Sequence, residues 1–541
     1  MIKLKERGWA HVVRCIVLLC PLILSISSVL RMGYKRHLAR VAVAPESRYF
    51  QRVYSLVSAN FADPLSPEQA IYHGAIPGML RSLDPHSTFL DEQEFRRHTE
   101  AMNGKHSGVG VELAYQNHQL IVVGCHSNSA ALRAGIRPGD LVVAINGKPA
   151  DTLKVTEVLH LLSGPEGTTT HFSIQRDGRP LDFSLKSELM SRKSVADVTW
   201  IRPGLAYLAI LIFNEATPTE LEANLRKCQQ QGMEGLILDL RDNPGGVMHA
   251  AADVADQFLR IGETILYQRG RAFSEITYTA RHGNGGHEYP LVILVNRNTA
   301  SAAEALAGAL QDHDRAWVLG DDTYGKGLVQ TLNALPEDTG LALVKSRYYT
   351  PSGRLLQRRR FNVALGHYER QPAPDLVAWM TDSGRPVYAG AGIGPDEHYA
   401  PQYDHFQSSL ARRFACTEFV TDYLNRHPTV VDESWQPDQA MVREFRDYLR
   451  QHRFTFTNAE SVRHDEWIRQ RLRQAMFRNR FGLEETPRLL LATDAMVQRA
   501  LTALPKAKAL LDSAGRTQQH VELTDAGRRA PGQATSGAAS R

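Results

Sequence analysis

Cysteine is scarce in this sequence, and its placement excludes the usual cysteine-based sites. Only five cysteines occur in 541 residues, and two of them, Cys15 and Cys20, lie in an apolar run near the N-terminus. The other three, Cys125, Cys228 and Cys416, are far apart, and no Cys-x-x-Cys or Cys/His ligand spacing is present. At most one disulfide could form. The sequence therefore predicts neither a disulfide framework nor a zinc site, and it predicts no bound metal.

Strong charge and phosphate-binding loops are missing as well. The formal net charge is +5 over the whole chain, and 22% of the residues are charged. The basic run at 358–360 has no interleaved aromatic residues, which favours a solvated loop over nucleic-acid contact. Neither Gly-x-x-x-x-Gly-Lys nor a strand-opening Gly-x-Gly-x-x-Gly occurs. No nucleic-acid partner and no cofactor is predicted.

One long apolar run, from Cys15 to Leu30, stands near the N-terminus between basic residues (Lys3, Lys5, Arg7, Arg14 and Arg31). As a helix it spans about 24 Å, short of the ~30 Å hydrocarbon core, a length typical of a signal peptide or short signal anchor. No small-x-small cleavage site is visible, so an uncleaved anchor is favoured, and a buried core helix is the alternative. A leader at 1–44 predicts membrane contact and export to the periplasmic side of a bacterial inner membrane.

Two regions with different predicted secondary structure follow the leader. Residues 45–104 read as helical, with a turn at Asp84-Pro85-His86-Ser87 where Pro85 forces the preceding residue out of a helix. Residues 105–190 contain short β runs, the first at 109–113, with hairpin signals such as Asn146-Gly147. The second region is predicted to be a compact β-rich domain.

The remaining regions complete a multidomain α/β fold class. Residues 191–402 alternate strands with helices, and the apolar stretches 236–240 and 291–295 are typical of strands covered on both faces. Residues 403–514 read as helical without a catalytic pattern. Residues 515–541, rich in Ala, Gly, Ser and Arg, predict a disordered tail. Helical regions therefore flank the β-rich domain and the α/β core.

Ser301 is the first candidate for catalysis. It follows the apolar stretch 291–295 and a polar turn, and it opens an alanine-rich helix. The pattern Ser301-x-x-Glu304 fits a capping box, and this segment alone favours that structural role. A serine at such a turn also lies beside free backbone N–H groups and a positive helix end, where an oxyanion is stabilised. Both interpretations stay open until a base is found.

Lys326 is the best candidate for that base. His313 lies twelve residues after Ser301, about 18 Å along the same helix, and cannot reach it. His86 is not excluded, but no neighbouring Asp or Asn marks a triad. Lys326 lies between two glycines, and its pKa must fall from ~10.4 to near neutral, which costs roughly 4 kcal/mol that desolvation can supply. A solvated loop lysine is the alternative. Gln330 reaches the amine only if the segment bends, since on a flat strand it lies ~13 Å away.

The third element is the stretch 238–246, where a buried strand ends in a polar turn with two glycines. The N–H of Gly245 or Gly246 could point into a cavity with no side chain in the way. A plain strand-to-helix turn is the alternative. Asp239 and Asp242 suggest a carboxylate pair or a metal site, but strand and turn geometry gives no reason for them to converge.

Together these motifs resemble the C-terminal processing peptidase (tail-specific protease) family. The matching segments follow one another in order over about residues 45–400: 83–89, 239–246, 298–304, 324–330, 349–353 and 392–396. The resemblance implies that Ser301 is the nucleophile, Lys326 the base and Gln330 the residue that orients the lysine. It also implies an oxyanion hole from the N–H of Ala302 with that of Gly245 or Gly246. The implied core is a crotonase-like ββα-spiral fold.

By the same resemblance, residues 105–190 are similar to a PDZ domain inserted before the protease core. The segment 107–111 stands where a carboxylate-binding loop would hold the C-terminus of a peptide (Gly108, Val109, Gly110 and Val111) while the next strand pairs with it. Ser163 stands where many family members carry a basic residue, which puts a ligand-driven switch using that charge in doubt. Residues 358–380 read as an insertion.

The leading hypothesis is a serine endopeptidase that captures apolar, unstructured protein C-termini and cleaves upstream through an acyl-enzyme. A PDZ adaptor on a degenerate protease fold is the second hypothesis, although a competent residue occupies every catalytic position. A crotonase-like acyl-CoA enzyme is the third, and it does not account for the PDZ-like domain. Dimerisation and docking of an adaptor protein are the roles considered for the C-terminal helices.

Overall fold

The computed structural model describes most of the chain from residue 45 to residue 528. The described ranges are 45–116, 119–126, 128–176, 178–191, 193–362, 367–370, 378–400, 402–427, 429–482 and 486–528. The predicted leader, with Cys15 and Cys20, lies outside them, as does the end of the predicted tail. Within these ranges no helix combines the length and the apolar character needed to cross a membrane. The chain divides into two compact units between Gly78 and Met79.

The first unit is helical, as the sequence predicts. It contains α2 (Pro45–Asn60) and η1 (Glu68–Ala75), and α3 (Ile76–Arg81) crosses the boundary between the units. The apolar side chains of α2 are not buried, since α2 has no buried residue and Tyr49 is 74% exposed.

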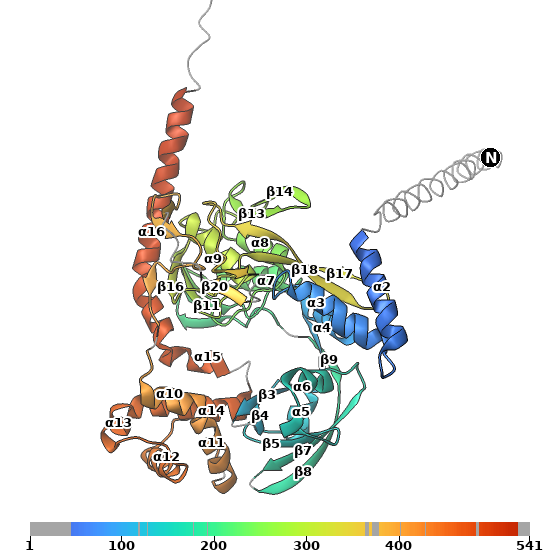
Figure 1. Ribbon diagram of the computed structural model, residues 1–541. Helices are drawn as coiled ribbons and strands as arrows, with labels where there is room; N and C mark the ends of the chain where they lie inside the picture. Colours follow the sequence, from blue (N-terminus) through green and yellow to red (C-terminus); the bar gives the residue numbers. More distant parts are fainter. Residues whose placement is uncertain are drawn as a thin grey trace, which may run out of the picture. The chain divides into compact units, whose positions relative to one another are not determined.

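A six-stranded sheet forms the centre of the α/β core (Figure 1). Its strands, in spatial order, are β10 (Thr199–Arg202), β11 (Leu205–Ala209), β12 (Gly235–Asp239), β15 (Leu291–Val295), β16 (Trp317–Gly320) and β23 (Glu397–His398). From β11 to β23 the neighbours are parallel, and β10 is antiparallel to β11. Every residue of β12 and β15 is buried, which confirms the prediction of strands covered on both faces.

Helices from distant parts of the sequence cover this sheet. On one side, α7 (Thr217–Gln230), α8 (Met248–Asp256) and α9 (Ala302–Asp312) share a hydrophobic cluster with strand residues such as Leu236 and Ile293. A second cluster joins strand residues such as Ile237 and Val292 to α16 (Ala495–Arg528). Alternate residues of the same strands point to the two clusters, so α16 covers the face opposite α7–α9. The predicted helical C-terminal region thus completes the core, and α16 extends beyond residue 515.

We expect the α/β core to lose stability when Leu504, a residue of α16 that contacts the central sheet, is shortened to alanine. Leu504 is 8% exposed, and its Cδ2 lies 3.7 Å from the position that a Cβ on Gly235 of β12 would take. Leu504→Ala should cost about 2–5 kcal/mol of unfolding free energy, because it leaves a cavity between helix and sheet. Thr502→Ala, at an exposed position of the same helix, is the control. Urea unfolding followed by circular dichroism measures both, and equal midpoints for the two variants would contradict this packing.

A five-stranded antiparallel sheet lies beside the first. Its members are β1 (Thr88–Leu90), β13 (Thr264–Gly270), β14 (Phe273–Thr279), β17 (Leu328–Ala334) and β18 (Gly340–Tyr349), and β18 pairs with β1, β13 and β17. The turn predicted at Asp84 is present, because its carboxylate accepts from the N–H groups of His86 and Ser87. The chain beyond the turn is a strand of this sheet, so the turn lies next to β17 and β18.

The β-rich domain, residues 105–191, has its own hydrophobic cluster. Its elements are β2 (Lys105–Gly108), β3 (Val111–Gln116), β4 (Gln119–Cys125), α5 (Ala130–Ala134), β5 (Leu141–Ile145), β6 (Lys148–Pro149), η2 (Ala150–Thr152), α6 (Val155–Leu162), β7 (Thr169–Arg176), β8 (Arg179–Lys186) and β9 (Glu188–Ser191). The order of the main sheet is β3-β4-β5-β7-β8, so β3 is an edge strand. The strand predicted from Val109 begins two residues later, because Gly110 has a positive φ of 77°.

The remaining helices pack around a separate cluster that includes Phe419, Phe445 and Phe477. They are α10 (His405–Arg412), α11 (Ala415–Arg426), α12 (Gln439–Gln451), α13 (Asn458–Arg463), α14 (Asp465–Phe481), α15 (Thr486–Leu490) and η3 (Leu491–Thr493). Two hairpins, β19 (Arg359–Asn362) with β20 (His367–Arg370) and β21 (Ala378–Met380) with β22 (Pro386–Tyr388), complete the described elements. The predicted insertion at 358–380 contains the first hairpin, and α4 (Glu92–Met102) precedes β2.

Candidate active site

Ser301 lies at the turn between β15 and α9, as the sequence predicts. Its φ of 56° and ψ of −116° are unusual for a residue other than glycine, and such strained backbone is found preferentially at functional sites. The residue is 8% exposed. The predicted capping-box partner is also present, since the Glu304 carboxylate accepts from the N–H of Ser301 at 2.8 Å. The capping interaction with Glu304 and the strained backbone expected of a functional serine therefore occur together at this turn.

Glu304 links the serine turn to the loop that carries Lys326. Its buried carboxylate accepts hydrogen bonds from the N–H groups of Ser301, Gly325 and Lys326 at 2.7–2.9 Å, and from the hydroxyl of Thr323 at 2.5 Å. Burial raises the pKa of Glu304, and these donors oppose that rise. All four groups donate to it, an arrangement that suits an ionised carboxylate, which only accepts. One side chain thus fixes both segments.

Lys326 is oriented by Gln330 in this structure. Its Nζ donates to Oε1 of Gln330 at 2.7 Å, and Nε2 of Gln330 donates to the carbonyl oxygen of His86 at 2.8 Å. The bend that this contact requires is present, because the pairing of β17 with β18 shifts register between Val329 and Gln330. Burial lowers the pKa of Lys326, while the charges of Glu304 and Asp84 oppose that change. The amine therefore loses its proton more readily than an exposed lysine.

The backbones of Ser301 and Lys326 are held near each other by a shared neighbour. Both residues donate their backbone N–H to one carboxylate oxygen of Glu304. Among the contacts of the described residues, no hydrogen bond joins Oγ of Ser301 to Nζ of Lys326. Catalytic hydrogen bonds are often long before substrate binds, so this geometry is compatible with proton transfer in the complex.

The double-glycine turn packs directly against Ser301. A Cβ at Gly245, where φ is +94°, would lie 2.8 Å from Cβ of Ser301 and 2.9 Å from N of Ala302. The N–H of Gly245 donates to Oδ1 of Asn243, so it is not free. The N–H groups of Gly246 and Ala302 have no hydrogen-bond partner within the described part of the chain. Of the two predicted glycine donors, Gly246 is the one left available.

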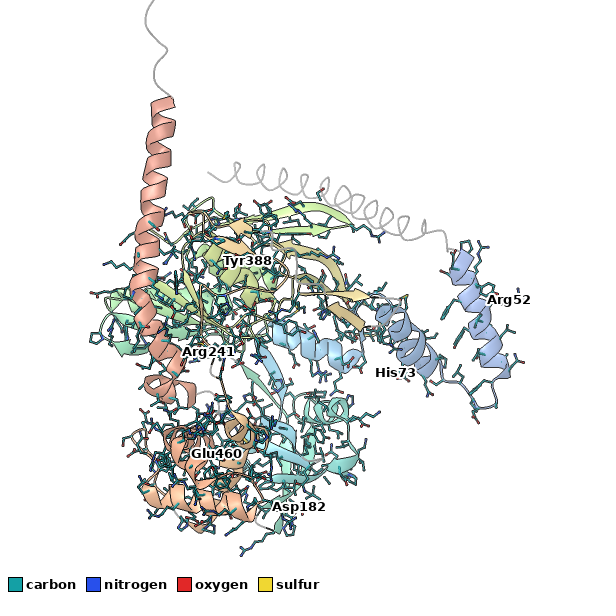
Figure 2. The ribbon with its side chains drawn as sticks, turned by 60° about the vertical axis from the view of Figure 1, so that its left-hand side comes forward. Arg52, His73, Asp182, Arg241, Tyr388 and Glu460 are labelled. Atoms are coloured by element: carbon teal, nitrogen blue, oxygen red, sulfur yellow. The ribbon has the colours of Figure 1, made fainter. Side chains whose placement is uncertain are left out.

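The other polar groups near this turn have separate roles. Asp239 pairs with Arg241 (labelled in Figure 2) and accepts from the Tyr207 hydroxyl, and Arg241 also pairs with Asp494 at the start of α16. Asp242 accepts instead from the side-chain amides of two asparagines, Asn296 and Asn298. The two carboxylates of the motif therefore hold different neighbours rather than converging.

Of the two histidines considered as alternative bases, His313 is not placed for that role. Both ring nitrogens of His313 are engaged, with Asp382 at 2.7 Å and the carbonyl oxygen of Thr264 at 2.6 Å, and these contacts raise its pKa to about 9. His86 contributes its carbonyl oxygen to Gln330. Burial and the nearby charge of Lys326 lower the pKa of the His86 ring. His86 thus takes part through its backbone, which its side chain could not have indicated.

The predicted peptide-binding loop lies at one end of the pair formed by β3 and α6. A Cβ at Gly108 would lie 3.1 Å from the carbonyl oxygen of Leu162, at the end of α6. At the other end, the Tyr115 hydroxyl of β3 donates to the carbonyl oxygen of Leu153, just before α6. Helix and edge strand therefore run side by side from the loop onward. Gly110 packs closely on Ser129, which leaves no room for a side chain.

Exposed apolar side chains occur on α6, the helix beside the edge strand. Val109 is buried, with its carbonyl oxygen bound by the N–H of Ala131, and Val111 begins the edge strand. On α6, Val155 and Leu159 are 59% and 48% exposed, one helical turn apart. An edge strand beside exposed apolar side chains can accept an extended apolar segment.

A contact that the sequence did not indicate joins the β-rich domain to the core. Gln93 of α4 donates from Nε2 to the carbonyl oxygens of His160 and Ser163, at the end of α6. The ring of Phe95 on the same helix lies where a Cβ at Gly340 of β18 would be placed. Ser163, where the family resemblance leads one to expect a basic residue, thus contributes a backbone carbonyl here.

Comparisons with known proteins find two family models, curated relatives and solved structures that this chain resembles. Residues 204–363 match the family model described as peptidase family S41, and residues 121–176 match that of the PDZ domain. The carboxy-terminal-processing protease of Bartonella bacilliformis is 36% identical over 297 residues, 54% of this chain and 68% of that protein. The carboxyl-terminal-processing protease of Synechocystis is 36% identical over 296 residues, 53% of this chain and 69% of that protein. A solved photosystem II D1 C-terminal processing protease is 26% identical, covers 65% of this chain and 87% of its own, and has a TM-score of 0.40.

Proposed function

Because the chain belongs to the carboxy-terminal-processing proteases of peptidase family S41, and is a serine-type peptidase with a PDZ domain, we propose that it cleaves with a Ser301/Lys326 dyad. The neutral amine of Lys326 takes the proton from the Ser301 hydroxyl as the oxygen attacks the scissile carbonyl carbon. The resulting protonated lysine then gives that proton to the leaving amine. Water, deprotonated by the same amine, hydrolyses the ester and frees Ser301.

The N–H groups of Ala302 and Gly246 form the oxyanion hole in this mechanism. Both are unengaged among the described residues, and Ala302 is the first residue of α9, where the helix dipole adds positive potential. Two such donors stabilise the charge that develops on the carbonyl oxygen, and the loss of one typically costs about 2.7–4 kcal/mol. The core is proposed to have the crotonase-like spiral that the family resemblance implies.

One observation carries the proposal: the amine of Lys326 is bound by Gln330 and the pKa of Lys326 is lowered by burial, within a loop tied to Ser301 through Glu304. A solvated loop lysine would have none of these features. They also weigh against a protein that only binds its partners, since an adaptor has no need of a desolvated amine beside a strained serine.

A fluorophosphonate probe tests the chemistry directly. We expect a single adduct on Ser301, located by peptide mass spectrometry, together with cleavage of an unfolded reporter protein by the unmodified chain. Ser301→Ala should abolish both. Labelling of a different serine, or undiminished cleavage by Ser301→Ala, would reject the dyad.

We further propose that the PDZ domain selects substrates with apolar C-termini. A peptide added to the open edge of β3 would place its terminal carboxylate at the N–H groups of residues 108–111 and its side chains against Val155 and Leu159. Export and membrane attachment are proposed from the basic-flanked apolar run at 15–30, and a homodimer or an adaptor protein is proposed as a partner.

The tail preference has a measurable consequence. We expect Leu159→Glu to raise KM for a reporter with an apolar tail about tenfold, because a carboxylate then faces the tail bound along β3, while kcat changes little. Val143→Glu is the control, since Val143 is 48% exposed on β5, two strands from β3. Initial rates over a range of reporter concentrations give both constants. Equal KM values for the two variants would show that the tail binds elsewhere.

A further inference from the structure

Tyr348 is a second side chain that connects the two catalytic segments joined by Glu304. Its hydroxyl lies 2.8 Å from the carbonyl oxygen of Ser301 and 2.8 Å from the carbonyl oxygen of Lys326. The side chain is completely buried, and burial together with the charge of Glu304 holds its pKa well above the ordinary value. The phenol therefore keeps its proton over the working pH range. Because it has one proton, it donates to the two carbonyl groups in a shared or alternating way.

The two bridges together hold each catalytic residue at both ends of its peptide backbone. Glu304 accepts from the N–H of Ser301 and of Lys326, and Tyr348 donates to the carbonyl oxygen of each. Two buried side chains and one backbone hydrogen bond, from the N–H of Tyr324 to the carbonyl oxygen of Thr299, therefore join the two segments. Since the segments come from different elements, one a helix start and the other a loop before β17, these contacts set their separation.

Tyr348 is itself held firmly. It lies near the end of β18, which pairs with β17 on one side and β13 on the other, and its N–H donates to the carbonyl oxygen of Gly327. The hydroxyl is thereby anchored to the strand pair that also carries Gln330. Movement of the lysine loop relative to the serine turn would break a buried hydrogen bond, which typically costs about 1–3 kcal/mol when a group is left unsatisfied.

We propose that Tyr348 is a positioning residue, and that its hydroxyl sets the separation between Ser301 and Lys326 at which the proton is transferred. The inference rests on the proposed dyad mechanism. Proton transfer is sensitive to geometry, and a displacement of about 1 Å at a reacting group can cost on the order of 10²-fold in rate. A purely structural tyrosine, in contrast, would affect the stability of the core but not the turnover of the folded enzyme.

Tyr348→Phe isolates the hydroxyl, because it keeps the ring and removes a single oxygen. We expect kcat for an apolar-tailed reporter to fall about 10- to 100-fold, with KM within a factor of about three of wild type. The rate constant for labelling of Ser301 by a fluorophosphonate should fall by a similar factor. Tyr289→Phe is the matched control: Tyr289 is also buried in this core but precedes β15, at the end of the strand opposite the serine turn.

The outcomes separate this inference from the proposed function. If wild type cleaves, Ser301→Ala does not, and Tyr348→Phe labels as fast as Tyr289→Phe, the positioning role is wrong while the dyad stands. If Ser301→Ala still cleaves, the dyad itself fails. Labelling is followed as a first-order rate, which does not depend on the amount of folded protein, and melting curves show whether the fold is kept. A Tyr348→Phe chain that does not fold would overturn the proposal, because the hydroxyl would then be structural.

Discussion

Replacing Lys326 by methionine is expected to lower kcat/KM on the order of 10³- to 10⁴-fold, the upper part of the range that a general base contributes. Methionine keeps much of the volume of the lysine stem but can neither accept a proton nor donate to Gln330. Because nucleophile and base act as a unit, the double variant Ser301→Ala/Lys326→Met should be no less active than either single variant. Steady-state cleavage of the unfolded reporter measures all three.

Lys326→Arg distinguishes a base from a fixed positive charge. Arginine retains the charge but cannot be deprotonated in a protein, so it cannot take the serine proton. We expect it to be as inactive as Lys326→Met. Lys345→Ala, which removes an exposed lysine from β18, is the control and should leave kcat/KM near wild type. Substantial activity in Lys326→Arg would assign the lysine an electrostatic role and remove it as the base.

The pH dependence of the wild-type chain follows from the same assignment. A base must be neutral to act, so kcat/KM rises with pH as Lys326 loses its proton. Burial lowers the pKa of Lys326, and the rise should therefore be centred below 10.5, the value of an unperturbed lysine. A profile without such a rise would contradict the role given to burial.

The parts of the molecule that were predictable are those whose signal is local. The strands at 236–240 and 291–295 are apolar throughout, because both of their faces are covered, and a short apolar run bounded by turns indicates such a strand. The assignment of Ser301 and Lys326 rests on motifs of a few residues, and it stays a prediction. The leader also rests on a local pattern, and it stays a prediction because residues 1–44 lie outside the described ranges. The crotonase-like form of the core stays a prediction as well.

The parts that were missed depend on contacts between distant segments. The segment after Pro85 forms β1 only because β18, more than 240 residues later, provides its partner. Leu504 and its neighbours on α16 have the periodicity of any amphipathic helix, and nothing in that pattern states that it covers the sheet of the core. Gln330 reaches the amine of Lys326 because of a β-bulge, and the spacing of apolar residues in the sequence does not reveal such a bulge.

Glu304 shows how a local interpretation can be right and still incomplete. The capping pattern assigned it to Ser301 alone, whereas its carboxylate also receives three donors from the segment 323–326. Those donors come from about 20 residues away in sequence, beyond any helical pattern. A buried carboxylate needs several hydrogen-bond donors to stay ionised. The apolar residues that follow Glu304 in the sequence were therefore the available sign that this glutamate is buried and needs distant donors.

Glu304→Gln is therefore expected to have the second largest effect, a fall in kcat/KM of about 10²-fold or more. One oxygen of Glu304 accepts from the N–H groups of Ser301 and Lys326, and the other from Gly325 and the hydroxyl of Thr323. An amide replaces one of these oxygens by a donor. In either orientation it leaves at least one buried backbone N–H unsatisfied, at a cost of about 1–3 kcal/mol, and the serine turn and the lysine loop separate.

The pH profile of Glu304→Gln provides a second and independent result. The charge of Glu304 raises the pKa of Lys326 against the effect of burial, so its removal should let that pKa fall. The rise of kcat/KM with pH should then be centred at a lower pH than in wild type, even though the maximum is smaller. Glu337→Gln, the same change at an exposed site in the β17–β18 turn, should move neither quantity. A loss of activity with the centre of the rise unmoved would mean that Glu304 acts on geometry alone, and a centre at higher pH would show that the carboxylate does not stabilise the charged lysine.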